Sequence, residues 1–178
     1  MGSTVRDMRV INSIQDFDRR WLLLLQHSRS WLALHARAVS KTGDGSLYVV
    51  VSGLIYLLSA TGETFLIHIL AAFSFERIAY WVVKNGLKRK RPAEVLPNFQ
   101  SHITASDEFS FPSGHTSATF LFATVLGLHF GPIMLPLYLW SMAVGISRVY
   151  LGVHFPTDTV MGAILGMSIA LSTAYGMY

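Results

Sequence analysis

A stretch without Asp, Glu, Lys or Arg covers residues 113–147, and it constrains the fold more than any other feature of the sequence. About 20 apolar residues are enough for a helix to cross the hydrocarbon core of a bilayer, so this stretch is too long for one crossing. Gly131 and Pro132 divide it, and a Gly-Pro pair is typical of a turn. The stretch therefore predicts two membrane-spanning helices joined by a tight turn.

The composition favours a membrane protein over a water-soluble one. Apolar residues make up 52% of the chain and charged residues only 13%, whereas soluble domains average about 25% charged residues. The charges are bunched, which leaves long uncharged stretches of the kind that face lipid. We expect an all-α fold, a polytopic bundle of five to six transmembrane helices, with residues 1–178 forming a single domain.

Three further segments are expected to span the membrane. Residues 46–62 and 64–83 precede the long uncharged stretch, and residues 156–178 follow it. Gly162 and Gly166 give the last of these a small-xxx-small face, which suits close packing between helices. Within residues 64–83, Glu76 and Arg77 either support a functional site or lie near the interface and pair with neighbouring residues.

Residues 1–42 predict an amphipathic helix that lies in the membrane interface and precedes a catalytic core of residues 43–178. Asn12 and Ser13, each followed three residues later by Gln15 or Asp16, resemble a capping box and so predict the helix start. No uncharged stretch here approaches the roughly 20 residues of a span, which favours an interfacial helix over a short first crossing. The N-terminus also lacks the pattern of a signal peptide.

The net charge of +4 and the pI near 9.6 could indicate a nucleic-acid partner. The basic residues lie beside hydrophobic spans, however, so the sequence favours the bilayer, anionic lipid head groups or phosphate as partners and disfavours nucleic acid. The absence of cysteine excludes disulfides, thiol nucleophiles and zinc-thiolate sites.

The order of the spans places two polar regions on one face of the membrane. If residues 64–83 end on one side, the next three spans cross, return and cross again. Residues 84–111 and 148–154 therefore share a face. Residues 93–111 form a long polar loop there, and loops of this length are often functional.

Two of the three clusters on this face can bind an anion. Lys84 and Arg91, in the pattern Lys-x6-Arg-Pro, can donate charge-assisted hydrogen bonds, and a guanidinium group matches phosphate oxygens in a bidentate way. Ser113 suits a helix N-cap. Together with Gly114 it exposes backbone N–H groups at the positive end of a helix dipole. Alone, the Lys-x6-Arg-Pro pattern could equally bind lipid head groups.

The third cluster contains Arg148, His154 and Asp158. Arg148 ends its span, where the helix dipole favours a cation. Pro156 suits the first turn of the last helix, which places Asp158 about one turn from His154. The carboxylate can then accept a hydrogen bond from one imidazole nitrogen and leave the other free to attack.

Together the three clusters are suited to phosphoryl transfer without a metal or cofactor, because the cations neutralise charge as Mg²⁺ does in kinases. We expect His154 to attack phosphorus and form a phosphohistidine, with Asp158 fixing the imidazole tautomer. His115 would protonate the leaving oxygen and then activate the hydrolytic water. We expect His68 and His129 to be interior histidines with satisfied hydrogen bonds.

The motifs Lys84-x6-Arg91-Pro92, Pro112-Ser113-Gly114-His115 and Ser147-Arg148-x5-His154-x3-Asp158 resemble the three-part signature of the type-2 phosphatidic acid phosphatase superfamily. This superfamily also includes vanadium haloperoxidases and acid phosphatases, and no signature position departs from its pattern. The resemblance implies a membrane-embedded, metal-independent lipid phosphatase. It implies catalytic roles for His154, Asp158 and His115, and phosphate binding by Lys84, Arg91, Ser113, Gly114 and Arg148.

The resemblance also implies a bacterial cytoplasmic (inner) membrane enzyme with its site on the periplasmic face. Its substrate would be undecaprenyl diphosphate, phosphatidylglycerol phosphate, phosphatidic acid or a lipid A phosphate. The positive-inside rule points to the opposite side, because Lys88, Arg89 and Lys90 crowd the catalytic face. A lipid phosphotransferase and a non-catalytic lipid-binding protein are the alternative functions. The sequence leaves the oligomeric state open.

Overall fold

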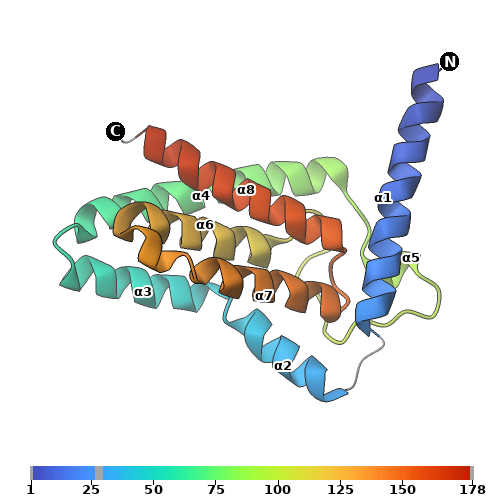
Figure 1. The fold of residues 1–178 in the computed structure, drawn as a ribbon, viewed down its shortest axis with the longest axis horizontal. Helices are drawn as coiled ribbons and strands as arrows, with labels where there is room; N and C mark the ends of the chain where they lie inside the picture. Colours follow the sequence, from blue (N-terminus) through green and yellow to red (C-terminus); the bar gives the residue numbers. More distant parts are fainter. Residues whose placement is uncertain (1, 27–29, 177–178) are drawn as a thin grey trace.

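The computed structural model describes residues 2–26 and 30–176, and over these residues every regular element is a helix (Figure 1). The helices are numbered in chain order, and one short 3-10 helix, η1, lies between α6 and α7. The elements are α1 (Gly2–Gln26), α2 (Ser30–Lys41), α3 (Gly45–Leu58), α4 (Gly62–Leu87), α5 (Pro92–Val95), α6 (Gly114–Phe130), η1 (Pro132–Met134), α7 (Leu137–Tyr150) and α8 (Pro156–Tyr175).

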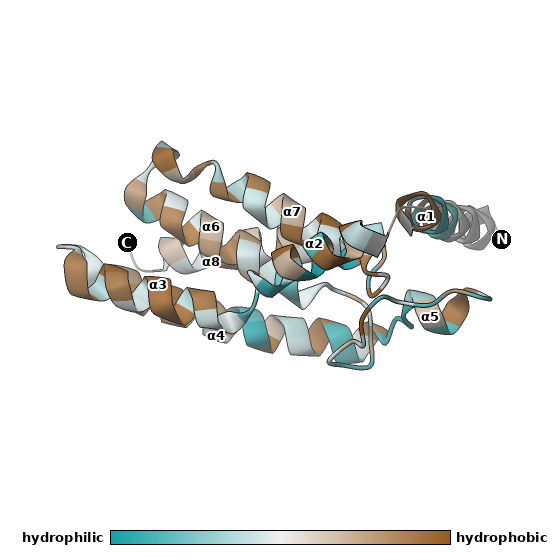
Figure 2. Cartoon of the chain, turned by 90° about the horizontal axis from the view of Figure 1, so that it is seen from below, coloured by the Kyte–Doolittle hydropathy of each residue, from teal (hydrophilic) through white to brown (hydrophobic). Residues whose placement is uncertain are grey.

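The bundle carries its apolar side chains on the outside as well as in the core. Among the described helices, Gly62–Val95, Pro132–Tyr150 and Pro156–Tyr175 are long and apolar enough to cross a membrane, and α3 is a shorter apolar helix. Leu58 and Val49 of α3 are 82% and 74% exposed, and Figure 2 shows hydrophobic residues over α3 and α7. Surfaces of this kind face lipid. The all-helical membrane fold expected from the sequence is confirmed.

Helix α6 is the central helix of the bundle, and α8 packs most closely against it. A Cβ atom added to Gly166 would lie 2.1 Å from the backbone oxygen of Ser117, and one added to Gly162 would lie 2.5 Å from that of Ser113. The predicted small-xxx-small face therefore makes this contact. The predicted turn at Gly131 is also present, with Gly131 at a φ of 77° that suits glycine.

Two predicted helix boundaries are wrong. Helix α1 is already helical from Gly2, so the capping box at Asn12 and Ser13 does not begin it. Helix α4 does not stop at residue 83 but continues to Leu87, so the side chain of Lys84 projects from helix and not from loop. The predicted polar loop 93–111 contains the end of the short helix α5.

The N-terminal region forms two helices that pack on the bundle. Helix α1 lies across the end of the bundle, as Figure 1 shows, and buries Asp18 and Leu22. Helix α2 packs against α7 and buries Ala33 and Ser40. The placement of α1 across the bundle is that of a helix in the plane of the membrane, and its interfacial role stays a prediction.

We expect Gly166→Ala to destabilise the protein by about 1–3 kcal/mol, because the added methyl group forces α6 and α8 apart. The midpoint of thermal unfolding in detergent measures this effect. Gly53→Ala in α3 is the matched control, because a Cβ there meets nothing within 4 Å and alanine favours a helix. Equal midpoints for the two variants would contradict the proposed helix contact.

Candidate active site

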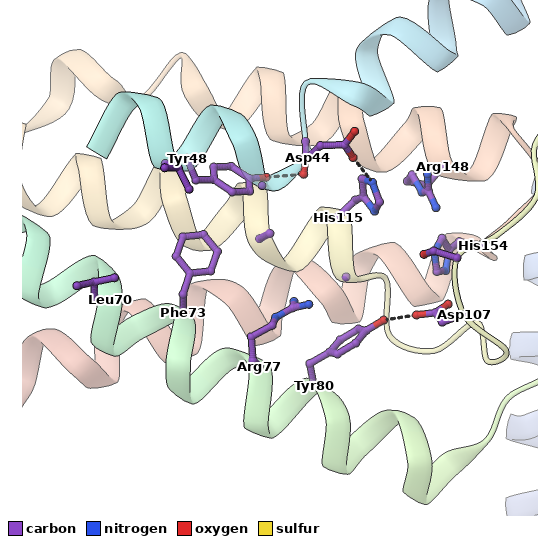
Figure 3. A pocket seen from close by; sticks show the side chains of 16 residues that line it. Asp44, Tyr48, Leu70, Phe73, Arg77, Tyr80, Asp107, His115, Arg148 and His154 are labelled. Carbon is purple, nitrogen blue, oxygen red and sulfur yellow. Dashed lines mark hydrogen bonds and ion pairs between the residues drawn. The ribbon is translucent and has the colours of Figure 1, made fainter. Parts of the chain in front are cut away.

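A cavity of about 540 Å³ is lined by residues of the second and third sequence clusters, and the first cluster contacts its lining residue Asp107 (Figure 3). Its polar wall contains His115, Arg148 and His154, and its apolar wall contains Leu70 and Phe73 of α4. The predicted convergence of the motifs on one face is therefore present in the structure.

His154 lies in the loop between α7 and α8 and is 2% exposed. Its Nδ1 lies 2.7 Å from the backbone carbonyl oxygen of Ser110. A carbonyl oxygen can only accept, so Nδ1 carries the proton and Nε2 keeps a lone pair. Burial lowers the pKa of His154 to about 4, even though the nearby Asp158 opposes this shift. The imidazole is therefore neutral near pH 7 and able to act as a nucleophile.

Asp158 does not accept the imidazole hydrogen bond that the sequence predicts for it. Its Oδ2 lies 3.7 Å from His154 Nδ1, which is beyond hydrogen-bond distance. Oδ2 instead accepts the backbone N–H of Phe155 at 2.8 Å and so caps α8. The carbonyl group of Ser110 therefore fixes the tautomer directly, and Asp158 acts on the imidazole through its charge. No side-chain pattern in the sequence could have identified a backbone carbonyl group.

Arg89 connects Asp158 to the N-terminal helix α1. It donates to Asp158 Oδ1 at 2.6 Å and to Asp18 Oδ2 at 2.6 Å. Asp18 also accepts the backbone N–H of Thr157 at 3.0 Å. The sequence placed Asp18 on the charged side of an amphipathic helix, but in the structure it is fully buried. Arg89 therefore holds the start of α8 in place, a role that its position in a basic run does not reveal.

Helix α6 begins at Gly114, and Ser113 is its N-cap as predicted. The Ser113 hydroxyl group is buried, however, and lies 2.9 Å from Thr116 Oγ1, so it does not line the cavity. A Cβ on Gly114 would lie 3.1 Å from the Tyr80 ring, a tight contact that would require a small shift of that side chain. His115 lines the cavity, and its Nε2 lies 2.9 Å from Asp44 Oδ1. Asp44 was predicted only as part of a turn.

Arg148 has an unsatisfied donor beside the cavity. Its Nη1 donates to Ser40 Oγ at 2.9 Å. Its Nε is buried and hydrogen-bonds none of the described residues. Arg148 lines the cavity, but its Nε is closed off from solvent, so an acceptor such as a phosphate oxygen reaches that donor only if neighbouring side chains move.

Lys84 and Arg91 do not line the cavity, because both bind the carboxylate of Asp107. Lys84 Nζ lies 2.7 Å from Asp107 Oδ2, and Arg91 Nη2 pairs with Oδ1. Tyr80 adds a hydrogen bond to Oδ2 at 2.8 Å. Burial would raise the pKa of Asp107, but the hydrogen bonds and charges of these partners outweigh it and lower the pKa to about 2. The ionised carboxylate of Asp107 is therefore bound to Lys84 and Arg91, the two cations that the sequence predicts to bind phosphate.

Glu76 and Arg77 pair with each other, with Arg77 Nε 2.6 Å from Glu76 Oε2; Glu76 is fully buried, whereas the Arg77 side chain is half exposed. The pairing does not decide between the two expectations for them, because Arg77 also lines the cavity. His68 is a buried histidine with satisfied hydrogen bonds, as predicted. His129 lies 3.0 Å from it between ring nitrogens but is only partly buried, so the prediction of an interior histidine is wrong there. Over residues 2–26 and 30–176, no three His, Asp or Glu side chains are grouped to hold a metal ion.

The sequence profile of the PAP2 superfamily matches residues 52–178. The bacitracin transport permease protein BcrC of Bacillus licheniformis is 33% identical over 131 residues, which is 70% of this chain and 63% of BcrC. This chain thus spans less than two thirds of the length of that relative. The decaprenylphosphoryl-5-phosphoribose phosphatase of Mycobacterium tuberculosis is 31% identical over 137 residues, covering 75% of this chain and 74% of the relative.

Two solved structures share the fold. LpxE of Aquifex aeolicus has a TM-score of 0.75 at 25% identity, over 88% of this chain and 93% of LpxE. A PAP2-type phosphatidylglycerolphosphate phosphatase of Bacillus subtilis has a TM-score of 0.73 at 25% identity, over 92% of this chain and 85% of the enzyme. The motif resemblance, the profile match and these shared folds agree: the chain belongs to the PAP2 superfamily.

Proposed function

We propose that this protein is an integral-membrane lipid phosphatase that hydrolyses a phosphomonoester or diphosphate head group through a phosphohistidine intermediate. One observation carries the proposal: the neutral imidazole of His154 and the cationic side chain of Arg148 line one cavity, whose other wall is apolar. A nucleophile, an anion-binding donor and an apolar surface suit a phosphate group attached to a lipid tail.

In the first proposed step, Nε2 of His154 attacks the phosphorus atom. The bond between phosphorus and the lipid oxygen breaks, and the leaving oxygen takes a proton from His115. Asp44, at 2.9 Å from His115, stabilises the protonated imidazole that this step requires. The guanidinium group of Arg148 and the N–H groups at the start of α6 bind the phosphoryl oxygens and so neutralise their charge.

In the second step, water attacks the phosphohistidine and gives its proton to His115. The bond between phosphorus and nitrogen breaks, inorganic phosphate leaves, and His154 returns to its neutral form. The carbonyl group of Ser110 holds the Nδ1 proton of His154 in both steps. The mechanism uses cations of the protein and no metal ion.

Lys84 and Arg91 enter the mechanism once the substrate displaces Asp107. In the free protein Arg91 also donates to the Asp107 backbone oxygen at 3.0 Å and to the backbone oxygen of Val153. Each of its three guanidinium nitrogens thus makes a hydrogen bond, and two of them bind Asp107, so movement of the loop that carries Asp107 would free Arg91 for phosphate. We propose that the substrate phosphoryl group replaces the Asp107 carboxylate on both cations.

Two relatives are named for lipid-linked substrates, decaprenylphosphoryl-5-phosphoribose and phosphatidylglycerolphosphate. For this protein we propose undecaprenyl diphosphate, phosphatidylglycerol phosphate, phosphatidic acid or a lipid A phosphate as the substrate. We place it in the bacterial inner membrane with the site on the periplasmic face. Release of inorganic phosphate from one purified lipid distinguishes this hydrolase from a phosphotransferase.

His154→Ala should lower turnover of the cognate lipid phosphate by about 10³-fold or more, because the nucleophile is lost. Phosphate release in detergent with chelator present measures this effect. Brief incubation with ³²P-labelled substrate should label the wild type on His154 through an acid-labile bond. His35→Ala, at an exposed histidine of α2, is the control. Full activity of His154→Ala would contradict the assignment of His154 as the nucleophile. Activity that requires Mg²⁺ would contradict the metal-free mechanism.

Asp107→Asn should tighten the binding of inorganic phosphate by about tenfold, since it removes the anion that competes for Lys84 and Arg91. The inhibition constant of phosphate at neutral pH, where a pKa of about 2 keeps Asp107 ionised, reports the change. Glu108→Gln removes the neighbouring exposed carboxylate and should leave the constant unchanged. Weaker phosphate binding by Asp107→Asn would argue that Asp107 only holds the two cations in place.

A single cysteine at Thr104 should react with a membrane-impermeant maleimide from the periplasmic side. The chain has no cysteine of its own, and Thr104 is exposed in the loop on the site's face. Ala60→Cys, in the turn between α3 and α4 at the other end of the bundle, should react only from the cytoplasmic side. The reverse pattern would place the site in the cytoplasm, as the positive-inside rule predicts.

A further inference from the structure

One face of α4 runs from the apolar end of the cavity to its phosphate end. Leu70, Phe73, Arg77, Tyr80 and Lys84 follow one another at helical spacing and so share this face. The first four line the cavity, and Lys84 binds the cavity-lining residue Asp107. A lipid tail along Leu70 and Phe73 would therefore lead past Arg77 to the site of phosphoryl transfer.

Arg77 presents part of a fixed guanidinium group to this cavity. Its Nε and Nη2 each donate to a carboxylate oxygen of Glu76 at 2.6 Å. Glu76 is itself fully buried and accepts the hydroxyl group of Ser117 at 2.7 Å. The Arg77 side chain is 52% exposed, and its Nη1 hydrogen-bonds none of the described residues. Figure 3 shows the side chain pointing from α4 into the pocket, between Phe73 and Tyr80.

The position of Arg77 along α4 separates it from the scissile phosphoryl group. Seven residues of helix place its Cα roughly 10 Å from that of Lys84, toward the apolar end of the cavity. Lys84, His154 and Arg148 belong to the phosphate end. A group that contacts Arg77 therefore lies between the scissile phosphoryl group and the lipid tail.

We propose that Arg77 is a specificity-determining residue that binds a second phosphoryl group on the tail side of the scissile one, so that the site prefers lipid diphosphates to lipid monophosphates. This inference rests on the proposed phosphatase function. The guanidinium group lies over the Tyr80 ring, 4.5 Å from its centroid. Its N–H groups that do not bind Glu76 suit phosphate oxygens, whereas an isoprenyl chain offers them no acceptor.

The chemistry of a diphosphate gives Arg77 a role in the transition state as well as in binding. When His154 attacks the terminal phosphorus, the bridging P–O bond breaks and its electron pair goes to the bridging oxygen. His115 protonates that oxygen, and the leaving group is a lipid monophosphate. Its negative charge grows as the bond breaks, so a cation beside it stabilises the transition state. The leaving group of a monophosphate ester is a neutral alcohol, which gains little from Arg77.

Farnesyl diphosphate and farnesyl monophosphate form the test pair, because they share one tail and differ only in the second phosphoryl group. Initial rates of phosphate release with purified protein in detergent give kcat/KM for each. For Arg77→Gln we expect kcat/KM to fall by about tenfold or more for the diphosphate and by less than about threefold for the monophosphate. Arg77→Lys should keep a substantial part of the diphosphate activity.

Because Arg77 pairs with Glu76, Arg77→Gln leaves a buried carboxylate without its partner and could destabilise the fold. A second variant is therefore needed to separate this effect from a loss of substrate binding. The double variant Glu76→Gln/Arg77→Gln removes both charges, and it should show the same selective loss of diphosphate activity. Lys88→Gln removes an exposed cation just beyond the end of the same helix and should change neither substrate.

Equal losses for both farnesyl substrates in the folded variants would overturn the inference and leave Arg77 as a structural partner of Glu76. Unchanged diphosphate activity in both variants would overturn it as well. If the protein is not a lipid phosphatase at all, the result differs. The wild type would then release no phosphate from either farnesyl substrate or from a panel of lipid phosphates.

Discussion

The site depends on the backbone contact between the N-terminal ends of α6 and α8. The N–H group of Ser113 donates to the carbonyl oxygen of Asp158 at 2.9 Å, and Gly162 lets the two helices approach at the next turn. This contact joins the second motif to the third and places His115 and His154 on one cavity. Hydrophobic burial between helices is weak in lipid, so such close packing of small residues has to supply the attraction.

Charges inside the bundle are the second constraint, because an unpaired ion at membrane depth is costly. Nearly every charged group near the cavity is paired with one from another element or the neighbouring residue. The pairs are Lys84 and Arg91 with Asp107, Arg89 with Asp18 and Asp158, Arg77 with Glu76, and His115 with Asp44. Among the described residues, Arg148 is the cavity cation with a buried donor left over. The pairing thus holds the surrounding loops in place around the cavity.

The features that the sequence predicted correctly are those set by local spacing. The turn at Gly131, the glycine face of α8 and the N-cap position of Ser113 follow from backbone geometry over a few residues. The convergence of the motifs followed from counting membrane crossings. The features that it missed depend on contacts between distant parts of the chain. Asp107 and Asp44 carry no distinctive local pattern, and each becomes part of the site only because a loop brings it there.

Helix α3, which forms part of the cavity wall, is short for a membrane-spanning helix. At about 1.5 Å per residue, the 14 residues of Gly45–Leu58 rise about 21 Å, which is less than the roughly 30 Å thickness of the hydrocarbon core. Tyr48 and Val49 of this short helix line the same cavity as Leu70 and Phe73 of α4. The cavity thus lies against a wall that spans only part of a bilayer, and its apolar end would open toward acyl chains. Under the proposed function, a lipid substrate would then enter sideways, with its head group at the phosphate end of the cavity and its tail running along Leu70 and Phe73 toward the bilayer.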